Sequence, residues 1–259
     1  MVIISPEVFF STFVIVLGAI FGSFFNVCIY RIPNHLSIMW PASHCPVCNT
    51  PLKPWNNIPI LSYLFQRGKC SFCGAKIHWH YVIVEVITPI VFFLIFYKSD
   101  FKFTLFFAKN IFFFSIAIIL FFIDSFHKIL PDILTIPLIF IGFIFTFFAK
   151  DISIINSLLS SIIVFAILYL ISYIYYKSTN KIGLGGGDIK LFSAIGAFFG
   201  FQGVVFILFF SSVLAVFWYV FSKMKREDQL PFGPFIIFAA FLFFLFGNNI
   251  IQSYLNLFL

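Results

Sequence analysis

Long, uninterrupted runs of apolar residues divide this chain and restrict the folds open to it. A helix needs about 20 apolar residues to cross a hydrocarbon core roughly 30 Å thick. Only 10% of the residues are charged, against about 25% in a typical soluble domain. The sequence therefore predicts an all-α membrane protein with about eight transmembrane helices. The candidate spans are 9–29, 82–97, 103–123, 132–149, 152–176, 189–201, 203–222 and 232–247.

The positions of lysine and arginine predict which way the chain crosses the membrane. Of these 16 residues, twelve fall on one side of the predicted spans and four on the other, namely Lys98, Lys102, Lys109 and Lys150. Cytoplasmic loops collect Lys and Arg, so the side with twelve is predicted to be cytoplasmic and the N-terminus periplasmic. This topology explains the net charge of +7 without a nucleic-acid partner. The first apolar run lacks a small-residue cleavage pattern, so we expect a retained span.

One polar segment between the apolar runs is long enough to form a small domain. Residues 31–81 contain six of the 12 prolines and four of the five cysteines. We therefore divide the chain into a first transmembrane helix (1–30), a cytoplasmic loop domain (31–81) and a transmembrane domain (82–259).

The four cysteines of this loop domain have the spacing of a metal site. Cys45-Pro-Val-Cys48 and Cys70-Ser-Phe-Cys73 are separated by 21 residues, a length close to that of a zinc ribbon. Four thiolates fill a tetrahedral site, so Zn²⁺ would have a structural role. Two disulfides are the less favoured alternative, because disulfides are rare in the reducing cytosol. Nearby side chains that are alternative ligands, or ordinary polar residues of the loop, are His44, His78 and His80.

Two of the nine acidic residues stand at the same predicted membrane depth. Asp124 ends the third apolar run and Asp188 begins the sixth, both at the cytoplasmic face. Acidic residues next to hydrocarbon are costly and are functional candidates. If the two carboxylates lie about 4 Å apart, a repulsion of about 4 kcal/mol at an effective dielectric near 20 keeps one proton shared between them. One carboxylate then activates water while the other protonates the scissile carbonyl, as in aspartic proteases.

Simpler interpretations of these residues stay open from the sequence alone. Gly183–Gly187 is also typical of a flexible loop between spans, and Asp188 of a helix N-cap. Asp124 is also explained as an interfacial carboxylate that Lys128 neutralises. The sequence does not say whether two residues 64 positions apart meet.

Together, the motifs resemble those of the type IV prepilin peptidases, a family of membrane aspartic proteases with a GxGD signature. The resemblance extends over nearly the whole chain. The matching segments are Phe21–Arg31, Asn57–Tyr63, Arg67–Cys70, Ile123-Asp124 with Leu130-Pro131-Asp132, Gly185-Gly186-Gly187-Asp188 and Pro231–Pro234.

The resemblance implies that Asp124 and Asp188 form the protease dyad, supported by Gly185, Gly186 and Gly187. Asp132 would be structural, in the first turn of the fourth span. The cysteines match the zinc ligands of the family, and the substrates would be pilin and pseudopilin precursors with a short basic leader followed by an apolar helix.

Many relatives also methylate the new N-terminus with S-adenosylmethionine, and Gly68 and Glu85 match residues associated with that activity. The resemblance implies a multi-pass protein of the bacterial inner membrane with its active site facing the cytoplasm.

Two other functions are compatible with parts of the pattern. A GxGD protease with other substrates would share the aspartates, but such relatives lack the cysteine ribbon. An ion-coupled transporter with a zinc-stabilised domain would use aspartates near the bilayer midplane, whereas both aspartates here are predicted near one face.

Overall fold

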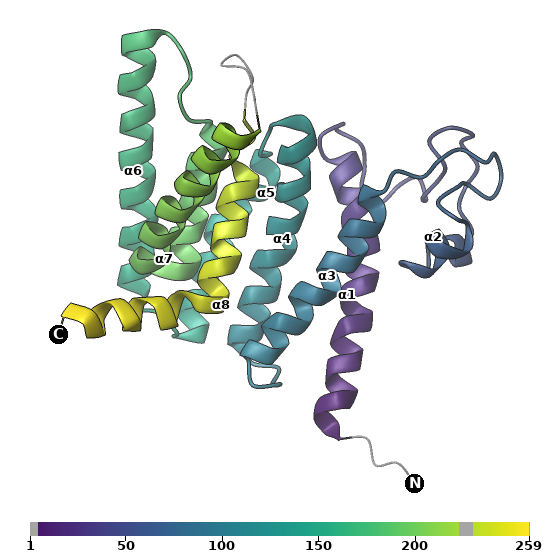
Figure 1. The fold of residues 1–259 in the computed structure, drawn as a ribbon, viewed down its shortest axis with the longest axis horizontal. Helices are drawn as coiled ribbons and strands as arrows, with labels where there is room; N and C mark the ends of the chain where they lie inside the picture. Colours follow the sequence, from purple (N-terminus) through teal and green to yellow (C-terminus); the bar gives the residue numbers. More distant parts are fainter. Residues whose placement is uncertain (1–4, 223–229, 259) are drawn as a thin grey trace. The chain divides into compact units, whose positions relative to one another are not determined.

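The computed structural model describes residues 5–222 and 230–258, so the charged run Lys223–Asp228, which the sequence predicts to be a solvated cytoplasmic turn, lies outside the described residues. Within the described ranges the protein is helical and contains no β-strand, only two isolated bridges in the cysteine loop (Figure 1). The elements are α1 (Pro6–Arg31), the 3₁₀-helix η1 (Pro54–Asn57), α2 (Leu61–Phe65), α3 (His80–Lys98), α4 (Leu105–His127), α5 (Asp132–Ala149), α6 (Ile154–Thr179), α7 (Gly186–Phe221) and α8 (Gly233–Phe258).

The long helices confirm the predicted membrane class. Six helices of the described chain are long and apolar enough to cross a bilayer, and the start of α8 is also apolar. At 1.5 Å per residue the 36 residues of α7 would extend about 54 Å, well beyond a hydrocarbon core of roughly 30 Å. However, α7 breaks at Gly200, which has φ 68° and ψ −169°. Its two arms correspond to the predicted spans 189–201 and 203–222, so about eight spans are present.

Side chains of neighbouring helices satisfy the backbone groups that the break in α7 releases. In an unbroken helix the N–H of Phe201 would bind the carbonyl of Ala197. Here the Phe201 N–H donates to Asn156 Oδ1 at 3.1 Å, and the Ala197 carbonyl accepts hydrogen bonds from Thr146 (2.9 Å) and Ser157 (2.7 Å). Since an unsatisfied backbone group in the bilayer costs several kcal/mol, these three polar side chains make the break possible.

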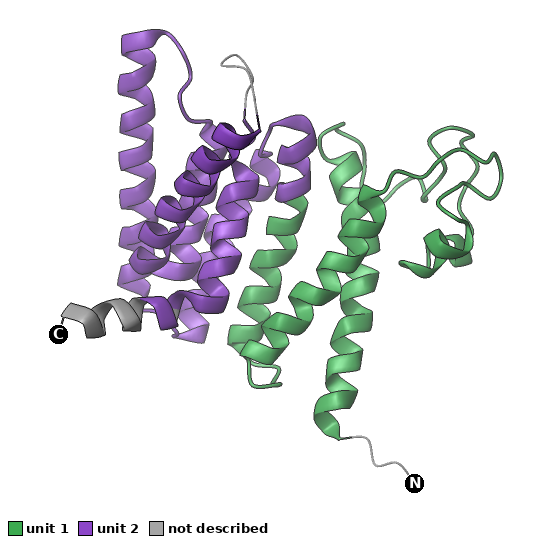
Figure 2. Ribbon diagram, in the orientation of Figure 1, with its two compact units in different colours: residues 1–119 green, residues 120–259 purple. Residues whose placement is uncertain are grey.

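The chain forms two compact units, residues 1–119 and 120–259, with the boundary inside α4 (Figure 2). In the first unit, α1 packs closely against α3 through two glycines one helical turn apart. A Cβ atom on Gly18 would lie 2.6 Å from the Cα of Pro89, and one on Gly22 would lie 2.9 Å from the Cα of Glu85. Small residues at this spacing let membrane helices approach closely.

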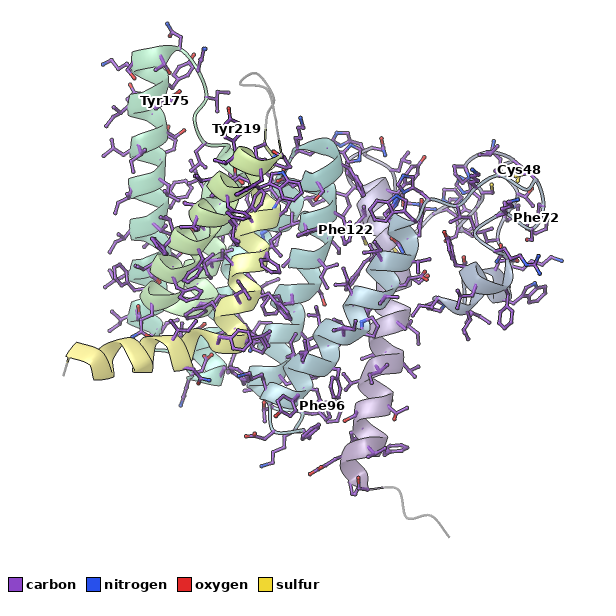
Figure 3. All side chains as sticks on the ribbon, viewed as in Figure 1. Cys48, Phe72, Phe96, Phe122, Tyr175 and Tyr219 are labelled. Atoms are coloured by element: carbon purple, nitrogen blue, oxygen red, sulfur yellow. The ribbon has the colours of Figure 1, made fainter. Side chains whose placement is uncertain are left out.

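In the second unit, α6 packs against α7 through serines. Ser160 donates to the Gly196 carbonyl at 2.9 Å, and the hydroxyls of Ser161 and Ser193 are 2.8 Å apart. Large aromatic side chains cover the helices of both units (Figure 3). Some, such as Phe96 and Phe122, are buried, while many others face outward, as expected where the surrounding solvent is lipid.

Candidate active site and cysteine centre

Asp124 lies in the last turn of α4 and is almost completely buried, with 5% of its surface exposed. The backbone N–H of Gly233, at the start of α8, donates to its Oδ2 at 2.9 Å. Lys128 is exposed, and the described part of the chain contains no ion pair between Lys128 and Asp124. The carboxylate is therefore held by a backbone donor from another helix and is not neutralised by the lysine.

Asp188 lies in the first turn of α7 and is partly buried. Gly185 is the N-cap residue of α7, so Asp188 is the third residue of the helix. Its carboxylate accepts a hydrogen bond from the Gly185 backbone N–H, as the acidic residue of a capping box does. A Cβ atom on Gly185 would lie only 2.9 Å from Asp188 Oδ2. This glycine therefore leaves the space that the carboxylate occupies.

The ends of α4, α7 and α8 meet around Leu130, which brings the two aspartates together. A Cβ atom on Gly187 would lie 2.6 Å from Leu130 Cβ, and one on Gly233 would lie 2.8 Å from Asp124 Oδ2 and 3.2 Å from Leu130 Cδ2. The charges of Asp124 and Asp188 interact with each other. Two carboxylates from distant parts of the sequence thus share one site at one end of the second unit.

Two other charged residues near this site, Lys190 and Asp132, are paired with each other. Lys190 Nζ and Asp132 Oδ1 are 2.6 Å apart, and these side chains are 28% and 60% exposed, respectively. Asp132 begins α5 after the N-cap Pro131, which agrees with its predicted position in the first turn. Lys190 therefore pairs with Asp132.

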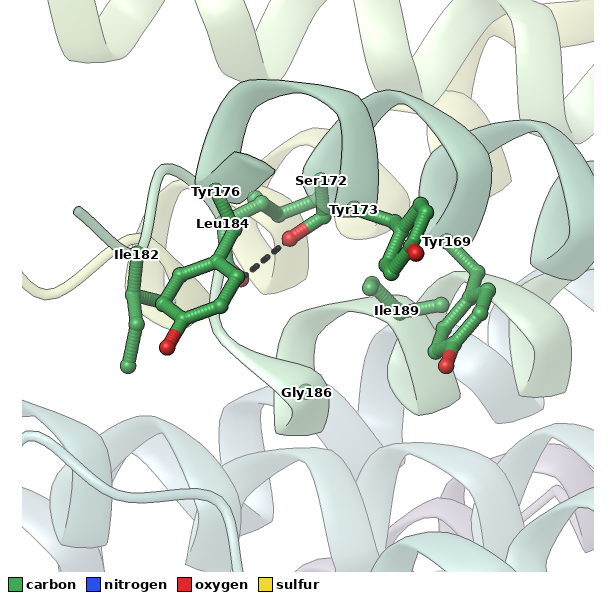
Figure 4. Close-up of a pocket in the computed structure, with 8 residues that line it drawn as sticks. All are labelled: Tyr169, Ser172, Tyr173, Tyr176, Ile182, Leu184, Gly186 and Ile189. Atoms are coloured by element: carbon green, nitrogen blue, oxygen red, sulfur yellow. Dashed lines mark hydrogen bonds between the residues drawn. The ribbon is translucent and has the colours of Figure 1, made fainter. Parts of the chain in front are cut away.

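A small pocket lies beside the glycine-rich segment, between α6 and the start of α7 (Figure 4). Its volume is about 240 Å³, below the roughly 300–1,000 Å³ of most small-molecule sites. The Ser172 hydroxyl donates to the Leu184 carbonyl at 3.2 Å and ties the glycine-rich segment to α6. The tyrosines that line the pocket are Tyr169, Tyr173 and Tyr176.

The four cysteines of residues 31–81 come together in the first unit. Their sulfur atoms all lie within 4.8 Å of one another, and Cys45 Sγ is 3.9 Å from Cys73 Sγ. Zn–S bonds of about 2.3 Å in a tetrahedron place sulfur atoms about 3.8 Å apart. All five cysteines of the chain lie in the described residues, and none forms a disulfide. The cluster thus has the geometry of a four-thiolate zinc site.

The two cysteine pairs are held by equivalent turns. The N–H of Asn49 donates to the Cys45 carbonyl at 2.8 Å, and the N–H of Gly74 donates to the Cys70 carbonyl at 2.9 Å. Both Asn49 and Gly74 have positive φ, at 55° and 71°. The sulfur of Cys48 is 3.2 Å from the Thr50 hydroxyl, and this hydrogen bond lowers the pKa of Cys48 to about 6. A thiolate at neutral pH is the form that binds a metal.

The three histidines near the cysteines lie outside the cluster. His44 Nδ1 is 3.1 Å from the Ala42 carbonyl, while the Nδ1 atoms of His78 and His80 are 2.6 Å apart. In the described chain, the metal-ligand group consists of the four cysteines without a histidine. Cys28, in α1, is buried and lies outside the group.

Gly68 and Glu85 contact opposite ends of α2: Glu85, a residue of α3, binds the residue before α2, and Gly68 lies just after α2. The buried Glu85 carboxylate accepts a hydrogen bond from the Ile60 N–H at 2.7 Å, just before α2, and a second from Ser23 of α1. Gly68 follows α2 with φ 67°, and its N–H donates to the Tyr63 carbonyl at 2.9 Å. No hydrogen bond joins Gly68 to Glu85 in the described chain. Glu85 ties the residue before α2 to α3, and Gly68 closes the turn that ends α2.

The sequence did not predict some of the groups that contact the site residues. The Gly233 N–H and Leu130 complete the aspartate site, and the Ile60 N–H binds Glu85. Gly233 and Leu130 both lie in segments that carry the family resemblance, which was the only signal for them. Every residue except proline has a backbone N–H, so the residue type does not indicate which N–H binds a carboxylate.

Comparisons with known proteins identify two regions. The family described as "Bacterial Peptidase A24 N-terminal domain" matches residues 16–99, and the "Type IV leader peptidase family" matches residues 111–220. The second region contains both Asp124 and Asp188, and the first contains the cysteine centre.

Relatives match nearly the whole chain. Proteins named "Prepilin leader peptidase/N-methyltransferase" from Neisseria gonorrhoeae, Dichelobacter nodosus and Pseudomonas aeruginosa are 30%, 31% and 29% identical. The alignments cover 91%, 93% and 93% of this chain and 90%, 93% and 92% of those proteins, respectively. No solved structure gave a significant match.

Proposed function

Because this chain belongs to the type IV leader peptidase family, we propose that Asp124 and Asp188 are its catalytic residues and that it removes the leaders of prepilins. The observation that carries this proposal is the packing of the helix ends that bear these carboxylates: Gly187, next to Asp188, and Gly233, which binds Asp124, both pack against Leu130. Each is also oriented by a backbone N–H, from Gly233 for Asp124 and from Gly185 for Asp188.

The arrangement supports an aspartic-protease mechanism. Two carboxylates that repel each other share a proton, so one accepts a proton from water while the other donates to the scissile carbonyl. The attacking water adds to the carbonyl carbon, and the nitrogen of the leaving peptide takes a proton as the C–N bond breaks. Gly185, Gly186 and Gly187 carry no side chain over the start of α7, which lets an extended peptide approach Asp188.

The protein is a multi-pass inner-membrane enzyme, and the remaining features of its topology are part of the proposal. The distribution of Lys and Arg puts the aspartates and the cysteine centre at the cytoplasmic face, with the N-terminus periplasmic. Pilin and pseudopilin precursors would reach the site with their apolar helix in the bilayer and their leader junction at this surface.

Purified full-length protein and a synthetic prepilin test the proposal. Asp124→Asn and Asp188→Asn should each abolish cleavage, because the amide neither accepts nor supplies the required proton. Asp132→Asn is the matched control: its ion pair with Lys190 is partly exposed and contributes at most about 1 kcal/mol, so cleavage should persist. Normal processing by either dyad variant would refute the assignment.

We further propose that the enzyme methylates the new N-terminus with S-adenosylmethionine, and that Gly68 and Glu85 support this reaction by positioning α2. Glu85→Gln keeps the shape of the side chain but weakens its hold on the Ile60 N–H, because a carboxylate is the stronger acceptor. Transfer of labelled methyl groups to a precleaved pilin should therefore fall while leader cleavage continues. Wild-type enzyme that cleaves but transfers no methyl group would refute this second activity.

The cysteine centre supports a third part of the proposal, a structural Zn²⁺ bound by Cys45, Cys48, Cys70 and Cys73. A bound zinc would lock the two cysteine turns together and fill all four of its positions. Such an ion holds the fold of the loop domain, and it has no open position for substrate.

A further inference from the structure

The short helix α2 presents an apolar face that the first unit leaves uncovered. Leu61, Leu64 and Phe65 are 50%, 62% and 83% exposed. Their spacing of three and four residues puts them on one side of the helix. An exposed cluster of large apolar side chains marks an interaction surface.

The hydrogen bonds of Glu85 fix the level of α2 along the membrane helices. Glu85 is the sixth residue of α3, so the Ile60 N–H that it binds lies about 8 Å inside the start of that helix. Its second partner, Ser23, precedes the end of α1 by eight residues, or about 12 Å. Figure 1 shows α2 level with α1 and not beyond its end. The start of α2 therefore lies beside the transmembrane helices.

The residues of α1 beyond this level are still mostly apolar. Of the seven residues between Ser23 and Arg31, five are apolar and two, Asn26 and Tyr30, carry polar groups; Phe24 is 47% exposed. The hydrocarbon region thus extends past the level at which α2 begins. Helices that lie in the membrane interface bury their apolar face about 5–10 Å deep, which agrees with the position of α2.

The charges of the surrounding loop match a phospholipid surface. Residues 32–79 contain no aspartate or glutamate and four basic residues, all exposed: Lys53, Arg67, Lys69 and Lys76. A zinc ion with four thiolates would add a charge of −2, which leaves the segment at +2. Arg67 and Lys69 directly follow the apolar face of α2. Basic residues at this position attract anionic headgroups and would repel a basic leader.

We propose that α2 is an interfacial membrane anchor. Leu61, Leu64 and Phe65 insert among the acyl chains of the leaflet next to residues 32–79, and Arg67 and Lys69 bind anionic phospholipid headgroups. The bilayer thereby holds the apolar face of α2, while Glu85 of α3 holds the Ile60 N–H just before this helix.

Photocrosslinking in the full-length protein tests this anchor. Phe65 is replaced by p-benzoylphenylalanine, and the matched control carries the same replacement at Phe72. Phe72 is an exposed phenylalanine of the second cysteine turn (Figure 3). Both proteins are reconstituted into phosphatidylcholine vesicles with phosphatidylglycerol, and circular dichroism and monodisperse elution confirm that each is folded. Leader cleavage plays no part in the readout.

The probe at position 65 should form phospholipid adducts in roughly tenfold greater yield than the probe at 72, the occupancy ratio expected from burying one such side chain. Arg67→Gln with Lys69→Gln should lower this yield in vesicles with phosphatidylglycerol and leave it unchanged in phosphatidylcholine alone. Equal yields at 65 and 72, or crosslinks from 65 to another segment of the chain, would overturn the anchor. An identical yield with and without the two basic residues would overturn the headgroup contact.

Discussion

Replacing Gly187 with alanine should separate the two aspartates by a predictable amount. The added Cβ would lie 2.6 Å from Leu130 Cβ and 3.0 Å from the Leu130 carbonyl oxygen. Non-bonded carbon atoms rest about 3.5–4.0 Å apart, so the start of α7 must move away from Leu130 by about 1 Å. Leu130 follows α4, the helix that carries Asp124, and the movement therefore displaces Asp188 from its partner.

The expected loss of activity follows from this displacement. Misplacing a catalytic group by about 1 Å costs roughly 100-fold in rate, which equals about 2.7 kcal/mol of transition-state free energy. Because the clash moves Asp188, the loss should appear in kcat for leader cleavage, with KM changed much less. Overpacking should also lower the free energy of unfolding by about 1–3 kcal/mol.

Gly186→Ala is the control for this experiment. No atom lies within 4 Å of a Cβ at that position, while the gain in helix propensity is the same, up to about 1 kcal/mol. We expect Gly186→Ala to unfold at no lower a temperature than the wild type and to lose less kcat than Gly187→Ala, because its methyl group meets no protein atom and any effect on the approach of the peptide should appear in KM. Cleavage of a synthetic prepilin by the two purified variants measures the difference. If both variants had the same kcat, the contact with Leu130 would not set the position of Asp188.

Three further changes test other parts of the structure. Asn156→Leu removes the acceptor of the Phe201 N–H and should lower the free energy of unfolding by about 1–3 kcal/mol, measured by denaturant titration in detergent. Arg31→Lys should expose the loop to chymotrypsin after Leu36 or Met39, because the buried Arg31 guanidinium donates hydrogen bonds to three backbone carbonyls between residues 37 and 41 and the single ammonium of lysine cannot reach all three. Cys73→Ser should reduce the zinc content of the purified protein, because a four-thiolate site loses a ligand.

For each of these substitutions, one outcome would contradict the structural role given to the residue. An unchanged unfolding midpoint for Asn156→Leu would mean that another group satisfies the break in α7. Equal rates of chymotrypsin cleavage in wild type and Arg31→Lys would show that the guanidinium does not hold the loop. Full zinc content in Cys73→Ser would remove that sulfur from the ligand set.

The local features of this protein could be predicted from its sequence. Each apolar run predicts a membrane helix without reference to the rest of the chain, because a helix satisfies its backbone hydrogen bonds within itself. The two C-x₂-C pairs likewise predicted a cluster, since each pair sits on its own tight turn. The sequence also placed a boundary near residue 202, close to the break at Gly200, although nothing in it indicated that Asn156 and Ser157 satisfy the released backbone groups.

The sequence by itself determined the membrane class, the approximate spans, the cysteine spacing and the two conspicuous aspartates, because these depend on residue type and short spacing. Only the tertiary structure decided that the helix ends bearing Asp124 and Asp188 pack around Leu130, that the Gly233 N–H, 109 residues away, binds Asp124, and that Glu85 binds the Ile60 N–H before α2. These contacts depend on which helix ends pack together. Packing is governed by the fit of surfaces such as Gly187 against Leu130, which the order of residues along the chain does not reveal.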